Sequence, residues 1–509
     1  MKRIFEILGM LAVVVAMAGL LGDGHFKPAS HFSQSDTTVW YCAGQAANQK
    51  ADPYQVEPMR SCELRYDADR TAPWVEPAPL PGYALAAFSL MARLPFTVVR
   101  TIWFYFILAA ILMTAVLLAQ RAKVSPLVAL LCLAMVDGYF NLTYGELPPV
   151  AVGALVVSAI LGSSKRYTAA AIVGSLAMIE PHIGLPACLS MFIWWPKTRV
   201  PFVACAAALA SISVATIGIP ANIEYFHTVL PLHAAAEIAA QDQYSLTRVL
   251  HILGLPDRFA LAAGSLSYFV MTALGVAIAR RTAKAAGSEL LVTLLPPALA
   301  LLGGPFVHDL QMAAAIPAAF ILAASTRPPL FVRASALIAI VFPWHAWSLA
   351  GAREQIGFLE IAAVVGAVLV ALRAKPTATR ATAVVAAVIA TIVIATAIEA
   401  IPRHKVGPPT TVAPMIVGAH DFGSADWAAY VSRDLPYSTP DARDVAEKIP
   451  VWLALMAMAA MSVSLSRSLS RSRRAVRAPS APEAGLLVPP RPTWQTAFMR
   501  TSQGGPGGS

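Results

Sequence analysis

The chain has 509 residues, of which 57% are hydrophobic and only 13% are charged. This charged fraction is about half of that in soluble domains, and a single water-soluble core cannot bury so much apolar chain, so the composition excludes a soluble enzyme, a coiled coil and a mostly disordered chain. The net charge of +10 comes from basic residues in short clusters between apolar runs, which is typical of membrane orientation signals and not of nucleic-acid binding. We therefore expect an all-α, polytopic integral membrane protein with no nucleic-acid partner.

Apolar runs follow one another along most of the chain. A helix needs about 20 apolar residues to cross the hydrocarbon layer, although broken or tilted helices use shorter runs. On this basis we predict about 12 to 14 transmembrane helices, near 4–22, 98–120, 125–141, 148–162, 167–180, 184–195, 200–219, 259–279, 288–302, 309–325, 334–350, 357–373, 381–401 and 450–465. The first run also resembles a cleavable signal peptide, but it extends through Leu21, which favours an uncleaved helix.

The basic residues indicate how these helices are oriented. With the N-terminus inside, most of the 38 Lys and Arg residues fall in short inner loops or in the C-terminal tail, as expected for cytoplasmic segments. Of the 28 carboxylates, only Glu6, Glu289 and Glu483 lie at or beyond the inner side. The runs on either side of Pro181 are either a hairpin or one kinked helix. The hairpin is favoured, because a single crossing over 167–195 would invert everything downstream.

This orientation divides the chain into one membrane domain, 1–465, and a tail, 466–509. Arg-Ser repeats followed by Pro and Gly predict that the tail is disordered, cytoplasmic and attracted to anionic lipid. Three segments are long enough to do chemistry outside the bilayer of the inner (plasma) membrane, all on the periplasmic side: 23–97, 220–258 and 402–449.

The first outer segment, 23–97, is too short and too rich in proline for a core of its own, so it is expected to lie over the helix bundle. Within it, Thr37–Asn48 could form a short interfacial helix with Val39, Trp40 and Ala43 on one side. Asp36 precedes this helix and is either its N-cap or a functional carboxylate.

Two of the five cysteines, Cys42 and Cys62, share the first outer segment. An oxidising periplasm permits a disulfide there, and a bridge closing roughly twenty residues would contribute on the order of 3 kcal/mol. We predict this disulfide. The other cysteines lie in apolar runs and are expected to pack, and no Cys/His spacing resembles a zinc site, so neither a metal nor another cofactor is predicted.

Ionisable groups at membrane depth are costly, so they are functional candidates by default. This chain places several at or just beyond the predicted outer ends of its spans: Asp36, Asp137, Glu146, Glu180, His182, Tyr244, Arg248, His308 and Asp309. The alternatives are local, namely a helix cap, a loop acid or a water-facing turn. All of these groups nevertheless fall on the same side of the membrane in the predicted orientation, as the residues of a single active site must. No phosphate-binding loop, dinucleotide motif or metalloprotease motif is present, so soluble-nucleotide chemistry has no visible site.

Several short motifs resemble glycosyltransferase family 87, a family of multispanning GT-C enzymes, in the right order from about residue 30 to 325. They are Asp36 with Val39-Trp40-Tyr41, Asp52-Pro53-Tyr54, Pro79-Leu80-Pro81, Leu94-Pro95, Tyr144-Gly145-Glu146, Glu180-Pro181-His182, Asp242-Gln243-Tyr244-Ser245-Leu246 and Pro305-Phe306-Val307-His308-Asp309. Three positions depart from the pattern of many relatives. Glu180 stands where a Lys is common, Glu146 replaces an amide, and Asp309 replaces a second His.

The resemblance implies transfer of a sugar, mannose-like or arabinofuranose-like, from a polyprenyl-phosphate donor to a periplasmic glycolipid or glycan acceptor. Asp36 would be the general base. His308 and Arg248 would face the leaving phosphate, and Glu146, Glu180, His182, Tyr244 and Asp309 would bind substrate. The competing hypotheses are a lipid-linked saccharide flippase and a noncatalytic envelope-assembly protein. Against transport, the inner halves of the spans carry almost no polar groups, and no repeated half-pattern is visible.

Overall fold

The computed structural model describes residues 35–66, 78–134, 141–239, 243–324, 365, 377–401 and 442–477. These residues form helices and one isolated bridge between Gln243 and His308. The longer helices are α2 (Ser35–Asn48), α3 (Val56–Tyr66), α4 (Gly82–Met91), α5 (Phe96–Ala122), α6 (Pro126–Leu133), α7 (Pro148–Ser163), α8 (Tyr167–Leu176), α9 (Pro181–Trp194), α10 (Arg199–Glu224), α11 (Leu230–Ala236), α12 (Leu246–Ile252), α13 (Asp257–Ala286), α14 (Leu291–Ala300), α15 (Ile316–Ala324), α18 (Thr377–Glu399) and α20 (Ala442–Arg477).

Four helical stretches of the described residues are long and apolar enough to cross a membrane: Phe96–Ala122, Pro196–Ala235, Asp257–Ala286 and Lys448–Arg467. Shorter apolar helices, among them α7, α8, α9 and α14, pack between them. The prediction of an all-α membrane protein is confirmed. The count of 12 to 14 stays a prediction, because the spans expected near 4–22, 334–350 and 357–373 lie outside the described residues.

Helices α8 and α9 form the predicted hairpin. The ring of Tyr167, at the start of α8, lies 6.0 Å from that of Trp195, just after α9. The two helices approach closely near their turn, because a Cβ at Gly184 would meet the carbonyl oxygen of Ala177 at 2.5 Å. The alternative of one kinked helix through Glu180 is therefore wrong, and Glu180 lies at the turn.

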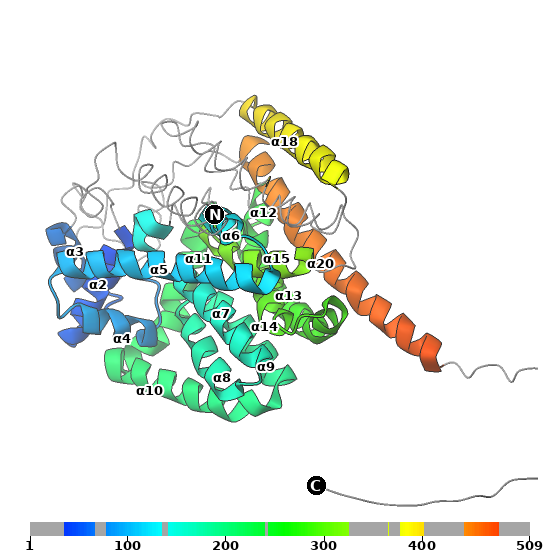
Figure 1. Cartoon of the computed structure of the whole chain (residues 1–509). Helices are drawn as coiled ribbons and strands as arrows, with labels where there is room; N and C mark the ends of the chain where they lie inside the picture. The colour runs from blue at the N-terminus through cyan, green and yellow to red at the C-terminus, as the bar shows by residue number, and fades with distance from the viewer. Residues whose placement is uncertain are drawn as a thin grey trace, which may run out of the picture.

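The first outer segment is anchored on the bundle by α2, which packs against α4 and is joined by aromatic contacts to α5 (Figure 1). The ring of Trp40 lies 5.2 Å from that of Phe88 and 6.4 Å from that of Trp103. Val39, Trp40 and Ala43 are buried, which agrees with the predicted apolar side of this helix. Cys42 and Cys62 form the predicted disulfide, which joins α2 to α3.

The C-terminal helix differs from the prediction. Helix α20 continues to Arg477, past the predicted start of the disordered tail at residue 466. The segment from 466 to 477 holds Leu, Ala, Val, Arg and Ser without Gly or Pro, so nothing in it stops a helix. The candidate membrane span within α20, Lys448–Arg467, agrees with the span predicted near 450–465.

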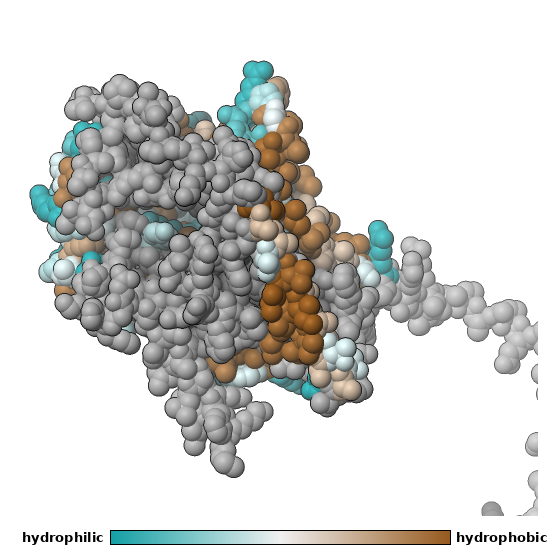
Figure 2. Space-filling view, turned by 90° about the horizontal axis from the view of Figure 1, so that it is seen from above, coloured by the Kyte–Doolittle hydropathy of each residue, from teal (hydrophilic) through white to brown (hydrophobic). Residues whose placement is uncertain are grey.

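Helix α18 runs along the outside of the molecule, beside one end of α20 (Figure 1). Figure 2 shows a continuous hydrophobic strip on this face, and Val385, Ile389, Ile392 and Val393 of α18 are all about half exposed. An apolar face of this size on a helix is expected where lipid is the solvent.

Candidate active site

A cavity of about 400 Å³ lies between the outer-segment helix α2 and the ends of several membrane helices. The N-terminal ends of α7 and α9 and the C-terminal end of α14 meet there. The short helix η7 (Asp309–Ala315) also begins at the cavity. All of these ends are outer ends in the predicted orientation, so the structure brings together groups that the sequence places on one side.

Five of the predicted site residues line this cavity: Asp36, Glu146, Glu180, His182 and His308. They come from four separate segments of the chain, and the cavity is where these segments meet. Three other predicted site residues do not line it: Tyr244, Arg248 and Asp309. Asp137 lies outside the described residues.

The three residues outside the lining are buried in the surrounding structure. The backbone N–H of Tyr244 donates to Val307 (2.7 Å), and its carbonyl accepts from Trp452 (3.0 Å). Arg248 is fully buried on α12. Asp309 accepts a hydrogen bond from the backbone N–H of Leu310 (2.6 Å). These groups therefore support the segments around the cavity.

Asp36 lies in the first turn of α2, where the helix dipole favours a negative charge. The next residue, Thr37, is fully buried and packs against Gly145. A Cβ at Gly145 would lie 2.0 Å from the Thr37 Oγ1, so only glycine allows the two segments to come so close. The indole N–H of Trp103 donates to the carbonyl of Gly145 (2.6 Å) and fixes this segment, which also positions Glu146.

Glu180 and His182 form another part of the cavity wall. Their side chains are 3.3 Å apart, and Glu180 is 8% exposed. The hydroxyl of Tyr268 on α13 donates to the carbonyl of His182 (3.1 Å), and Phe306 packs edge-on against the His182 ring. The turn between α8 and α9 is thus held against α13 and the segment that carries His308.

A tyrosine pair supports the wall beside α2. Tyr225, which lines the cavity, stacks on Tyr54 at 5.8 Å between ring centroids. Burial raises the pKa of the Tyr54 hydroxyl well above its ordinary value. This hydroxyl therefore stays protonated and donates to the carbonyl of Leu80 (2.5 Å), which ties the outer segment to the cavity.

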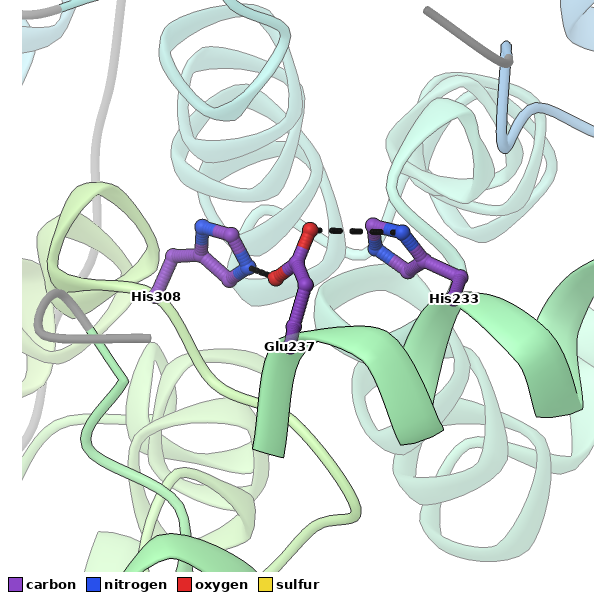
Figure 3. A group of neighbouring side chains, drawn as sticks. All are labelled: His233, Glu237 and His308. Carbon is purple, nitrogen blue, oxygen red and sulfur yellow. Dashed lines mark hydrogen bonds and ion pairs between the residues drawn. The ribbon is translucent and has the colours of Figure 1, made fainter. Parts of the chain in front are cut away.

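The sequence analysis missed His233 and Glu237, which line the cavity beside His308. Figure 3 shows the Glu237 carboxylate between the two imidazoles, with one oxygen toward each. Glu237 Oε1 is 3.3 Å from His233 Nδ1, and Glu237 Oε2 contacts His308 Nε2 and accepts from Gln243 Nε2 (3.0 Å). The spacing of four residues between His233 and Glu237 was the available signal, because it places both on one face of a helix.

The cavity reaches the apolar outer surface of the bundle. Leu185 of α9 and Phe269 of α13 both line it, and they are 42% and 63% exposed. Since α9 and α13 are membrane helices, a ligand with an apolar chain can reach the polar groups from between these helices.

Comparison with protein families shows that residues 81–305 match the model of glycosyltransferase family 87. This range contains Glu146, Glu180, His182, His233 and Glu237, while Asp36 precedes it and His308 follows it closely. Comparisons with curated proteins and with solved structures give no match. Residues 81–305 are therefore similar to glycosyltransferase family 87, a family of enzymes that transfer sugars.

Proposed function

We propose that the protein transfers a sugar from a polyprenyl-phosphate donor to a glycolipid or glycan acceptor on the periplasmic side, with Asp36 as general base. The sugar would be mannose-like or arabinofuranose-like. The observation that carries this proposal is the presence of Asp36, His182 and His308 around one cavity that also opens between apolar helices.

The shape of the cavity suits a lipid-linked donor. A polyprenyl chain stays in the bilayer, so its phosphate can reach a site only from the side, at the level of the membrane interface. The exposed, cavity-lining side chains of Leu185 and Phe269 provide such an apolar entrance. A soluble nucleotide-sugar would reach a site from water and would not need an apolar entrance between helices.

The polar groups suit the two charges that develop during transfer. The acceptor hydroxyl loses a proton as its oxygen attacks the anomeric carbon, and a positioned carboxylate that takes this proton contributes about 10²–10⁴-fold to the rate. The leaving phosphate gains negative charge and needs donors. His182 and His308 line the same cavity, and the N-terminal ends of α9 and η7 add partial positive charge.

Substitution of Asp36 by Asn tests the base. Purified protein would be incubated with radiolabelled polyprenyl-phosphate sugars, one hexose and one pentose, together with a membrane extract as the source of acceptor. We expect Asp36→Asn to lower transfer by about a hundredfold or more, because the amide cannot accept the proton, while yield and melting temperature stay unchanged.

Asp52→Asn is the matched control, because Asp52 lies in the same outer segment, caps the backbone N–H of Tyr54 (2.9 Å) and does not line the cavity. It should keep wild-type transfer. Full activity of Asp36→Asn would refute the assignment of the base. Movement of the labelled lipid across a vesicle membrane without a new glycosidic product would favour a flippase.

A further inference from the structure

His233, Glu237 and His308 have the composition and spacing of a metal-binding group. Each offers one ligand atom, and these three atoms lie within 4.8 Å of one another. Two imidazoles and one carboxylate are the protein ligands of a class of zinc sites that leave the fourth position open. Zinc ligands at about 2.0–2.2 Å from the ion in a tetrahedron lie roughly 3.3 Å apart, which is the separation of His233 Nδ1 and Glu237 Oε1.

The group is held in place before any ion binds. His233 and Glu237 are four residues apart on the helical segment α11–η6, so their side chains share a face. The backbone of His308 is fixed by its bridge to Gln243 and by a hydrogen bond from its N–H to Gln311 (3.0 Å). Gln243 also donates to the Glu237 carboxylate (3.0 Å), which is the kind of outer contact that orients metal ligands.

The charges around the cavity supply a second, independent reason for a cation. Four carboxylates line it, namely Asp36, Glu146, Glu180 and Glu237, whereas the described residues of the lining include no Lys or Arg. Among the described lining residues, a phosphate-bearing donor would therefore meet more carboxyl groups than Lys or Arg side chains. A divalent ion on the His233, Glu237 and His308 side chains would reverse this balance at the point where the phosphate must sit.

We propose that His233, Glu237 and His308 bind one divalent metal ion of the zinc type, whose open coordination position faces the cavity. Imidazole nitrogens favour zinc over magnesium or calcium. The site itself stands on the geometry of the three side chains, while a phosphate oxygen as the fourth ligand rests on the proposed function. The Cys/His spacing of the sequence did not indicate this site, because the third ligand comes from a different segment.

Metal binding is testable without any sugar donor. The full-length protein would be purified in detergent with an affinity tag that contains no histidine, stripped with a chelator and titrated with Zn²⁺ against a competing zinc dye. Metal content after dialysis would be measured by mass spectrometry. We expect about one zinc per chain for the wild type, and at least a tenfold weaker affinity for Glu237→Gln, since even outer-shell changes typically cost 10–100-fold.

His251→Ala is the matched control, because His251 also pairs with a carboxylate, that of Asp257 (2.8 Å), but lies outside the group. It should bind zinc as the wild type does. At one zinc concentration, zinc should raise the melting temperature of the wild type and of His251→Ala by equal amounts and that of Glu237→Gln by less. The melting curve of stripped Glu237→Gln, compared with that of the stripped wild type, reports whether the variant folds.

Equal zinc affinity of wild type and Glu237→Gln would overturn the proposal, as would a wild type that binds no zinc. Neither result depends on sugar transfer. If zinc binds as expected and no polyprenyl-phosphate sugar is used, the metal site stands and the proposed donor falls. If the wild type binds no zinc but still transfers sugar from the polyprenyl-phosphate donor, the metal site falls and the proposed function stands.

Discussion

Cys42 and Cys62 fix the helix that carries Asp36. Their disulfide joins α2 to α3 across a sequence separation of 20 residues. Closing a loop of this length removes entropy from the unfolded chain and is worth about 3 kcal/mol. We expect the double variant Cys42→Ala/Cys62→Ala to lose about this much free energy of unfolding and to melt at a lower temperature, as measured by thermal denaturation in detergent.

A free thiol provides the comparison for this change. Cys188 lies on α9 and is not part of a disulfide, so Cys188→Ala should change the melting temperature little. If the double variant melted at the same temperature as the wild type, the bridge would contribute nothing to the stability of the fold.

The sequence selected single candidate residues better than it indicated which of them lie together. Asp36, Glu146, Glu180, His182 and His308 were selected because an ionisable group at the end of an apolar run is costly unless it has a use, and all five line the cavity. Tyr244, Arg248 and Asp309 gave the same signal but are buried away from the cavity. This sequence signal reports only that placing an ionisable group at membrane depth costs free energy. A buried hydrogen bond within the protein can offset that cost as well as a bound substrate can.

The contact between α2 and the segment that ends at Gly145 positions both Asp36 and Glu146. Gly145 has a φ of +83°, and a Cβ there would collide with the Oγ1 of Thr37 at 2.0 Å. We expect Gly145→Ala to displace α2 and to lower both transfer and melting temperature, at a cost of about 1–3 kcal/mol or more. Thermal denaturation and the sugar-transfer assay would measure the two effects.

Gly254 allows the clash to be separated from the backbone strain. It has the same φ of +83°, but its Cβ would meet nothing within 4 Å. Gly254→Ala should therefore show the cost of strain alone. Adding Thr37→Ala to Gly145→Ala should recover part of the loss, because the colliding hydroxyl is gone. Equal costs at Gly145 and Gly254 would contradict the steric explanation.

Helix positions were predictable where the apolar run and its boundaries agree, as in α5, which spans Phe96–Ala122 against a predicted 98–120. The end of the next long run agrees as well. The run that was expected to end at 219 breaks at Gly218, whose φ of +79° separates it from a second helical stretch that reaches Glu224. Pro220 then lies in the first turn after the kink, where its missing N–H costs little.

At the scale of the whole molecule, the cavity gathers the ends of helices that alternate in direction. The N-terminal ends of α7 and α9 and the C-terminal end of α14 all meet there. Two helix ends lie on the same side of the membrane when the chain crosses the membrane an even number of times between them, and the predicted spans satisfy this condition for these three ends. The positions of Lys and Arg then predict which side it is, since cytoplasmic loops carry the excess.

Two exposed lysines, at opposite ends of the predicted crossings, test the orientation. Lys50 follows α2 in the outer segment, and Lys165 lies between α7 and α8 on the predicted inner side. In intact cells, a membrane-impermeant maleimide should label Lys50→Cys, whereas Lys165→Cys should react only after permeabilisation. Because α2 also carries Asp36, the label at position 50 reports the side of the cavity. The reverse pattern would place the cavity in the cytoplasm and exclude a periplasmic acceptor, and equal labelling of both positions in intact cells would contradict the crossings between them.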